Sequence, residues 1–186
     1  MLRLLMLVFL LAPGARAATL SGYTLPDVYP VAGQTLVLNG MGIRTLTIFN
    51  VRAYVAGLYV GQKSADPKAI LASGGPKVVL MQFLHTAEKS AVEKQYREGE
   101  SKNCGHGECP KQDEADFERL IAVTPGAAMG DTFTYICNPA GLRVLVNNKE
   151  IASFANPDLA VRILQGFIGE KPPSEDLKRQ LLGAAS

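Results

Sequence analysis

Arg44 is the residue whose type and setting most clearly suggest chemistry. It begins segment 44–49, in which alternating side chains place Arg44, Leu46 and Ile48 on one face of an expected strand. Two glycines before it allow the backbone to turn or to be approached closely. A guanidinium on an apolar face is costly unless it meets an anion or a hydrogen-bond acceptor. Arg44 therefore either anchors a ligand or is an ordinary strand-end arginine that reaches water or a carboxylate.

A second candidate site is segment 104–109, which contains two cysteines, a histidine and a glutamate between two expected helices. In an exported protein, cysteines this close together favour a disulfide between Cys104 and Cys109. The alternative is a zinc site that adds His106 and, as fourth ligand, Cys137 or the glutamate, although this spacing is loose for zinc. We expect the disulfide, no bound metal and no cofactor, with Cys137 buried as a small apolar side chain.

Other catalytic and binding patterns are not found in the sequence. The chain has only two histidines, and no Ser/His/Asp or Cys/His set stands at an informative spacing. The Gly40-x-Gly42 pair lacks the third glycine and the following helix of a phosphate-binding loop. Because no cluster of five or more Lys and Arg residues occurs, neither nucleic acid nor an anionic membrane surface is an expected partner.

Residues 1–17 have the pattern of a signal peptide. A short basic start precedes an apolar run over residues 4–12, and a small-x-small sequence ends at Ala17. The run is too short to span a bilayer, which needs about 20 residues. We therefore expect cleavage near Ala17, an exported, periplasmic location and no membrane span in the mature protein; a retained anchor is the alternative. Loss of Arg3 and Arg16 would leave 17 of the 19 basic side chains against 17 acidic ones.

Residues 18–186 are expected to form a single domain with a hydrophobic core. Strands are predicted at residues 34–38, 44–49, 52–60, 77–84, 131–137, 142–146 and 150–154, which are rich in apolar and β-branched side chains. Helices are predicted at 67–72, 86–101, 112–123, 157–167 and 174–182. Strand meanders interrupted by helices indicate an α+β fold with a mainly antiparallel sheet.

Four short motifs occur in an informative order: residues 38–44 (Leu-Asn-Gly-Met-Gly-Ile-Arg), 57–60 (Gly-Leu-Tyr-Val), 75–77 (Gly-Pro-Lys) and 166–172 (Gly-Phe-Ile-Gly-Glu-Lys-Pro). Their order and spacing over residues 20–183 resemble the chalcone isomerase family, most closely its bacterial, exported chalcone-isomerase-like branch. The resemblance implies an open-faced β-sandwich, in which a large, mainly antiparallel sheet is covered by a layer of helices.

The resemblance also assigns roles to individual residues. In the plant isomerases the arginine after the Gly-rich turn fixes the substrate phenolate, and a threonine and a tyrosine order a water near the ketone. Arg44 matches the arginine, Tyr54 stands at the threonine's place, and residues 90–99 hold no match for the later tyrosine and asparagine. Non-catalytic members use the arginine and a tyrosine to hold a fatty-acid carboxylate. The implied pocket contains Arg44, Leu46, Ile48 and Tyr54, with Arg44 and Tyr54 as the catalytic candidates.

The leading hypothesis is an exported protein that binds a small apolar molecule with an anionic or phenolic end, such as a fatty acid or a polyphenol. A guanidinium offers a planar fork to a carboxylate, and a phenol adds one donor. Strand alternation places Tyr54 rather than Tyr59 beside this pocket. One alternative is an intramolecular lyase that closes a ring on an α,β-unsaturated ketone. The other is a non-catalytic accessory protein of an envelope redox or transport system.

Overall fold

The computed structural model describes residues 17–20, 22–46, 50–103 and 111–184, which form nine strands and five helices. The strands are β1 (Ala17–Leu20), β2 (Tyr23–Pro26), β3 (Val28–Val31), β4 (Gln34–Leu46), β5 (Val51–Val60), β6 (Lys77–Phe83), β7 (Thr132–Asn138), β8 (Gly141–Val146) and β9 (Lys149–Phe154). The helices are α1 (Pro67–Ala72), α2 (Lys89–Asn103), α3 (Lys111–Val123), α4 (Pro157–Ile168) and α5 (Glu175–Leu181).

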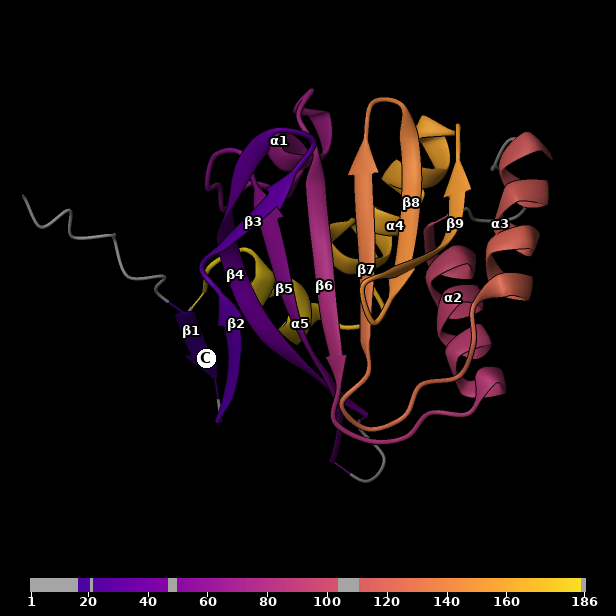
Figure 1. The fold of residues 1–186 in the computed structure, drawn as a ribbon, viewed down its shortest axis with the longest axis horizontal. Helices are drawn as coiled ribbons and strands as arrows, with labels where there is room; N and C mark the ends of the chain where they lie inside the picture. Colours follow the sequence, from indigo (N-terminus) through magenta and orange to yellow (C-terminus); the bar gives the residue numbers. More distant parts are fainter. Residues whose placement is uncertain (1–16, 21, 47–49, 104–110, 185–186) are drawn as a thin grey trace, which may run out of the picture.

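Strands β3 to β9 form one antiparallel sheet in sequence order, and β1 pairs with β2 in a separate two-stranded sheet. The large sheet is curled, with α4 and α5 behind it and α2 and α3 beside β9 (Figure 1). This arrangement confirms the predicted α+β class and the antiparallel sheet with its helical layer. The connections β3–β4, β7–β8 and β8–β9 are short turns, whereas α1 lies between β5 and β6, and α2 and α3 lie between β6 and β7.

The main hydrophobic core lies between the sheet and the helices. Phe133 and Leu142 from the sheet and Leu159 and Ile168 from α4 are at most marginally accessible to solvent. A second, smaller cluster lies on the opposite face of the sheet and includes Tyr59. Alternation along β5 separates the two clusters, because successive side chains of a strand point to opposite faces.

Residue types that favour turns and helix starts occupy those places in the structure. Asn147 and Asn148 have φ of 50° and 63° between β8 and β9, as a two-residue hairpin turn requires. The side chain of Asp66 accepts a hydrogen bond from the Lys68 amide at 2.9 Å and begins α1. Asn156 does the same for α4, where Pro157 occupies the first turn.

Several predicted boundaries were wrong. The expected strand 34–38 and the described residues 44–46 of the next expected strand belong to one strand, β4, because a bulge at Asn39 absorbs the irregularity without ending the pairing with β5. The helix expected from residue 86 begins at Lys89, because Ala87 forms an antiparallel bridge with Ala127. Strands β1 to β3 were not predicted, since each is only four residues long, and β2 and β3 each contain a proline.

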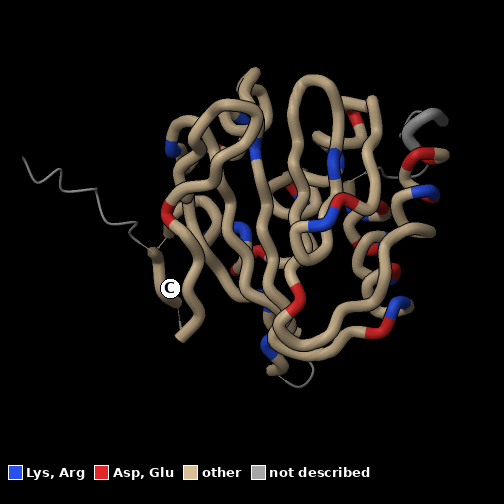
Figure 2. The backbone as a smooth tube through the Cα atoms, in the orientation of Figure 1, with Lys and Arg blue, Asp and Glu red and all other residues tan. Residues whose placement is uncertain are grey.

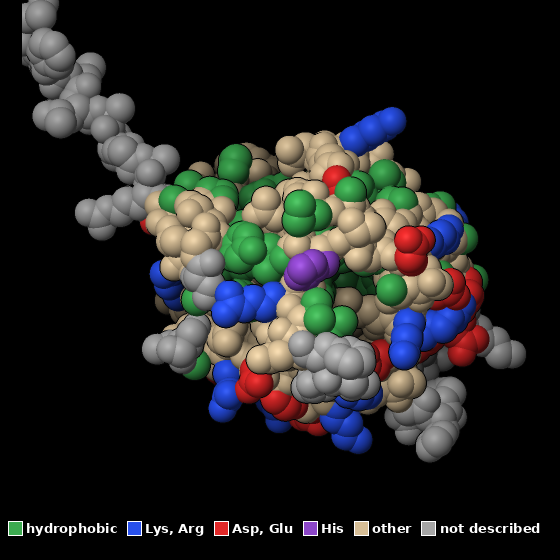
Figure 3. All heavy atoms as spheres, turned by 90° about the horizontal axis from the view of Figure 1, so that it is seen from below, with side chains coloured by type: hydrophobic (Ala, Val, Ile, Leu, Met, Phe, Trp, Pro, Cys, Tyr) green, Lys and Arg blue, Asp and Glu red, His purple; other side chains and the backbone are tan. Residues whose placement is uncertain are grey.

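Basic and acidic residues are interspersed along the backbone, with many of both signs on α2 and α3 (Figure 2). Seen from below, the molecule presents apolar side chains between charged ones (Figure 3). Of the helices in the described ranges, none is long and apolar enough to cross a membrane.

Candidate functional site

The two glycines before Arg44 are explained by the close packing of α5 on β4. A Cβ atom at Gly40 would lie 2.2 Å from the backbone oxygen of Gln180 and 2.6 Å from that of Leu181. At Gly42 it would lie 2.5 Å from the Gln180 side-chain oxygen. Only glycine therefore lets α5 lie this close to the strand.

Hydrogen bonds add to this contact between β4 and α5. The Asn39 amide donates to the Leu181 carbonyl at 2.8 Å, and the Ile43 N–H donates to Oε1 of Gln180, also at 2.8 Å. The bulge directs Asn39 toward the carboxyl end of α5, whose last carbonyls have no partner within the helix. These two bonds hold the carboxyl end of α5 against β4.

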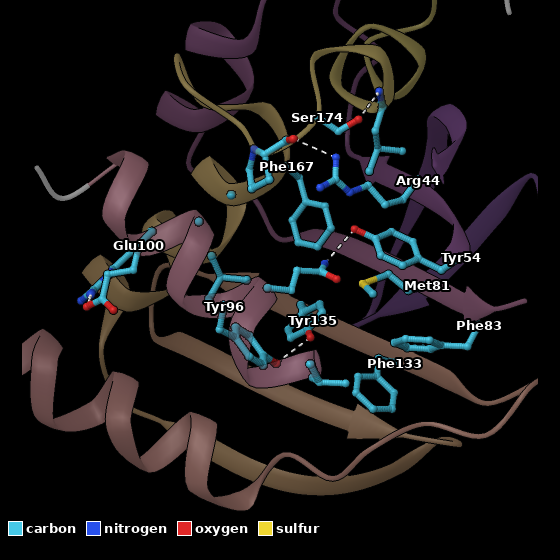
Figure 4. A pocket seen from close by; sticks show the side chains of 18 of the residues that line it. Arg44, Tyr54, Met81, Phe83, Tyr96, Glu100, Phe133, Tyr135, Phe167 and Ser174 are labelled. Atoms are coloured by element: carbon cyan, nitrogen blue, oxygen red, sulfur yellow. Dashed lines mark hydrogen bonds and ion pairs between the residues drawn. The ribbon is translucent and has the colours of Figure 1, made fainter. Parts of the chain in front are cut away.

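Arg44 follows these residues on β4, and its side chain reaches the segment before α5. Its Nη1 donates to the Pro173 carbonyl at 2.8 Å, and its Nη2 lies 3.9 Å from Oε2 of Glu98 on α2. The side chain is only 12% exposed. Figure 4 shows the guanidinium near Phe167 and Tyr54, at the edge of a cavity. Arg44 thus combines one short hydrogen bond with one loose ion pair, and its other N–H groups have no hydrogen-bond partner in the described part of the chain.

The cavity has a volume of about 60 Å³ and lies between the sheet and helices α2 to α5. Its walls are mainly aromatic and aliphatic, with a few polar groups. They are formed by Arg44, Tyr54, Met81, Phe83, Val92, Gln95, Tyr96, Gly99, Glu100, Phe117, Phe133, Tyr135, Arg162, Ile163, Gly166, Phe167, Pro173, Ser174 and Leu177.

Tyr54 is the direct cross-strand partner of Arg44 in the β4–β5 ladder. Its hydroxyl accepts a hydrogen bond from the Gln95 amide at 2.8 Å (Figure 4). Burial raises the pKa of Tyr54 to about 12, an effect that Arg44 and Gln95 partly offset. At neutral pH the phenol is therefore protonated, and its O–H can donate a hydrogen bond to a ligand beside Arg44.

Tyr96 and Tyr135 form a second polar group in the wall, with their hydroxyl oxygens 2.6 Å apart (Figure 4). Burial raises the pKa of Tyr135 well above its ordinary value, so this phenol also stays neutral. The sequence reasoning missed this pair and Gln95. The signal that could have found them is the spacing of Val92, Tyr96 and Gly99, which places one face of α2 toward the cavity.

An ion pair between a buried arginine and a partly exposed glutamate joins two helices at another part of the wall. Arg162 of α4 contacts the carboxylate of Glu100 on α2, and its guanidinium lies over the Phe117 ring at 4.3 Å. Its Nε and Nη1 atoms are buried and lack a hydrogen-bond partner in the described residues. The ion pair links α2 to α4 across the cavity roof.

The structure brings together only part of the predicted pocket. Arg44 and Tyr54 both line the cavity. Leu46 does not: it is the last residue of β4 and is 49% exposed, so the prediction that it forms a pocket wall was wrong. Shared strand parity is not sufficient, because the helices do not cover this end of the strand. Ile48 lies outside the described residues.

Tyr59, which the sequence placed away from the pocket, does not line the cavity. Tyr59 lies on the opposite face of the sheet and donates to the Pro26 carbonyl at 3.0 Å.

The predicted cysteine sites are only partly within the described chain. Cys104, His106 and Cys109 lie outside it. Cys137 is a free, buried thiol, and burial raises its pKa to about 12. Over the described ranges, no group of three or more His, Cys, Asp or Glu residues could hold a metal ion.

The family model described as chalcone isomerase-like matches residues 17–183, nearly the whole chain. The chain belongs to the chalcone isomerase-like family. Its fold is similar to the crystal structure of the Arabidopsis thaliana fatty-acid binding protein AtFAP1, with a TM-score of 0.68 and 15% sequence identity over 90% of this chain and 96% of that one. Among curated proteins, no sequence matches significantly.

Proposed function

We propose that this chalcone isomerase-like protein binds a small molecule with an apolar body and an anionic or phenolic end, such as a fatty acid or a polyphenol. One observation carries the proposal. The guanidinium of Arg44 is almost buried, makes one short hydrogen bond, and lies beside the Tyr54 hydroxyl at the edge of an apolar cavity. A carboxylate or phenolate placed there would accept hydrogen bonds from both residues.

The electrostatics of the cavity favour such a ligand. A cation removed from water is costly unless it is paired, and the 3.9 Å separation from Glu98 is too long for a hydrogen bond. A charge-assisted hydrogen bond to a ligand oxygen contributes roughly 1.5–3 kcal/mol. The aromatic walls would contribute through burial of the ligand's apolar body.

The size of the cavity limits how the ligand fits. An apolar cavity of about 150 Å³ admits benzene, whereas this one has about 60 Å³. An acyl chain or an aromatic ring therefore requires wall side chains such as Phe167 or Met81 to move. The similar A. thaliana structure is that of a fatty-acid binding protein, and this supports an apolar ligand for the present fold.

We propose binding rather than ring closure because of Tyr54. The resemblance expects a threonine at this position to order a water near the substrate ketone. The buried Tyr54 ring occupies more space and already accepts a hydrogen bond from Gln95. We further propose that the protein acts outside the cytoplasm, after removal of the apolar N-terminal segment.

The test is titration of a fluorescent fatty acid into wild type and four variants. We expect Arg44→Ala to weaken binding by about 1.5–3 kcal/mol, because a charge-assisted bond is lost. Arg44→Lys should fall between wild type and Arg44→Ala, because it keeps the charge without the planar fork. Tyr54→Phe should cost about 0.5–1.5 kcal/mol. The matched control is Arg143→Ala, which removes an exposed arginine on β8, paired with Glu150 and outside the cavity.

Urea unfolding of each variant separates loss of binding from loss of fold, because Arg44→Ala also removes the bond to Pro173. Equal affinities for all five proteins would contradict the proposal. Chalcone consumption, followed by absorbance with uncatalysed cyclisation subtracted, tests the alternative. Efficient turnover that disappears in Arg44→Ala would establish the isomerase instead.

A further inference from the structure

Glu98 lies between two cations beside the cavity. Its Oε2 is 3.9 Å from Nη2 of Arg44, and its Oε1 is 3.4 Å from Nζ of Lys102, one turn later on α2. The Glu98 side chain is 39% exposed, whereas that of Arg44 is 12% exposed. A solvent-facing carboxylate is thus shared between an inner, almost buried cation and an outer, exposed one.

The contacts of Glu98 with Arg44 and with Lys102 differ in length and in geometry. At 3.9 Å the carboxylate attracts Arg44 but accepts no hydrogen bond from it. The shorter contact with Lys102 is an i,i+4 pair on the outside of the helix, which Glu98 can keep without Arg44. A small rotation of the side chain would therefore release Arg44 and leave Glu98 paired.

From this geometry we infer that Glu98 is a displaceable counter-ion that sets the selectivity of the site. In the free protein it balances the charge of Arg44. When a ligand binds, its carboxylate pairs with Arg44 in place of Glu98, and Glu98 keeps only its ion pair with Lys102. Because two carboxylates beside one guanidinium repel each other, Glu98 lowers the affinity for an anionic ligand relative to a neutral ligand of the same shape. This inference rests on the proposed function.

The experiment compares octanoate with octanol as competitors of the fluorescent fatty acid. Glu98→Gln should bind octanoate about three- to tenfold more tightly, since a partly exposed like charge is removed, and octanol within twofold of wild type. Lys102→Gln should bind octanoate about two- to threefold more weakly, because Glu98 loses its outer partner. In the double variant that carries both Glu98→Gln and Lys102→Gln, the substitution of Lys102 should no longer weaken octanoate binding. If Lys102 acted only on the structure, its substitution would still weaken binding in the double variant.

Glu93→Gln is the matched control. Glu93 lies on the same helix, is also 39% exposed and also pairs with an i,i+4 cation, Arg97, but among the described residues no ion pair joins it to Arg44. Octanoate affinities that are equal in Glu98→Gln and Glu93→Gln would overturn the inference, and so would an equal gain for octanol. If binding still depends on Arg44 in either case, the proposed function stands and only the role of Glu98 is wrong. Affinities independent of Arg44 would overturn both.

Discussion

Substitution of Gly40 by Ala tests whether contact between β4 and α5 builds the site. The added methyl carbon would lie 2.2 Å and 2.6 Å from the backbone oxygens of Gln180 and Leu181. These atoms belong to the helix backbone and cannot rotate away. Helix α5 must therefore move off the strand, and the Pro173 carbonyl that holds Arg44 is close to its start.

The size of the effect follows from what the movement disturbs. Overpacking of a tight contact costs about 1–3 kcal/mol, and weakening the buried bond from Asn39 to Leu181 adds about 0.5–1.5 kcal/mol. Complete undocking of α5 would also expose Leu177 and Leu181, each contributing roughly 1.5–3 kcal/mol. We expect a loss of about 2–4 kcal/mol in the free energy of unfolding.

The assay is urea unfolding of Gly40→Ala beside Gly61→Ala. The control adds the same methyl group at a glycine with nothing within 4 Å of the added carbon. Gly61→Ala should be neutral or stabilising by up to about 1 kcal/mol, because alanine restricts the unfolded chain. Affinity for the fluorescent fatty acid should fall in Gly40→Ala alone. If the two variants unfold at the same urea concentration and bind equally well, α5 does not set the position of Arg44.

Two further predictions concern the cysteines and the N-terminus. Burial raises the pKa of Cys137 to about 12, so its thiol stays protonated at pH 7 to 9. Alkylation of Cys137 in the folded protein should therefore not increase between pH 7 and 9. After unfolding without reductant, Cys137 alone should be labelled if Cys104 and Cys109 form the predicted disulfide, and stoichiometric zinc would argue against that disulfide. N-terminal sequencing of protein from the envelope fraction should begin within a residue or two of Ala18, whereas an intact Met1 on protein in the cytoplasm would exclude export.

Much of the secondary structure follows from local features of the sequence. The cap signals at Asp66, Asn156 and Ser174 begin helices in the structure, since a side-chain oxygen satisfies an amide that no helical carbonyl can reach. Alternation along β5 is equally local and assigns Tyr54 and Tyr59 to opposite faces. The antiparallel pairing of β3 with β4, of β7 with β8 and of β8 with β9 follows from the short turns that connect them.

The site itself depended on contacts between distant parts of the chain. Arg44 is held by Pro173, 129 residues away, and no local pattern encodes that meeting. Likewise, the phenol of Tyr135 meets Tyr96 only because β7 and α2 face the same cavity. Sequence alternation could place Leu46 on the face of Arg44, but it could not show where the helical layer ends, and Leu46 is left exposed. The sequence thus determined which residues share a strand face, and the packing of the helices decided which of them line the cavity.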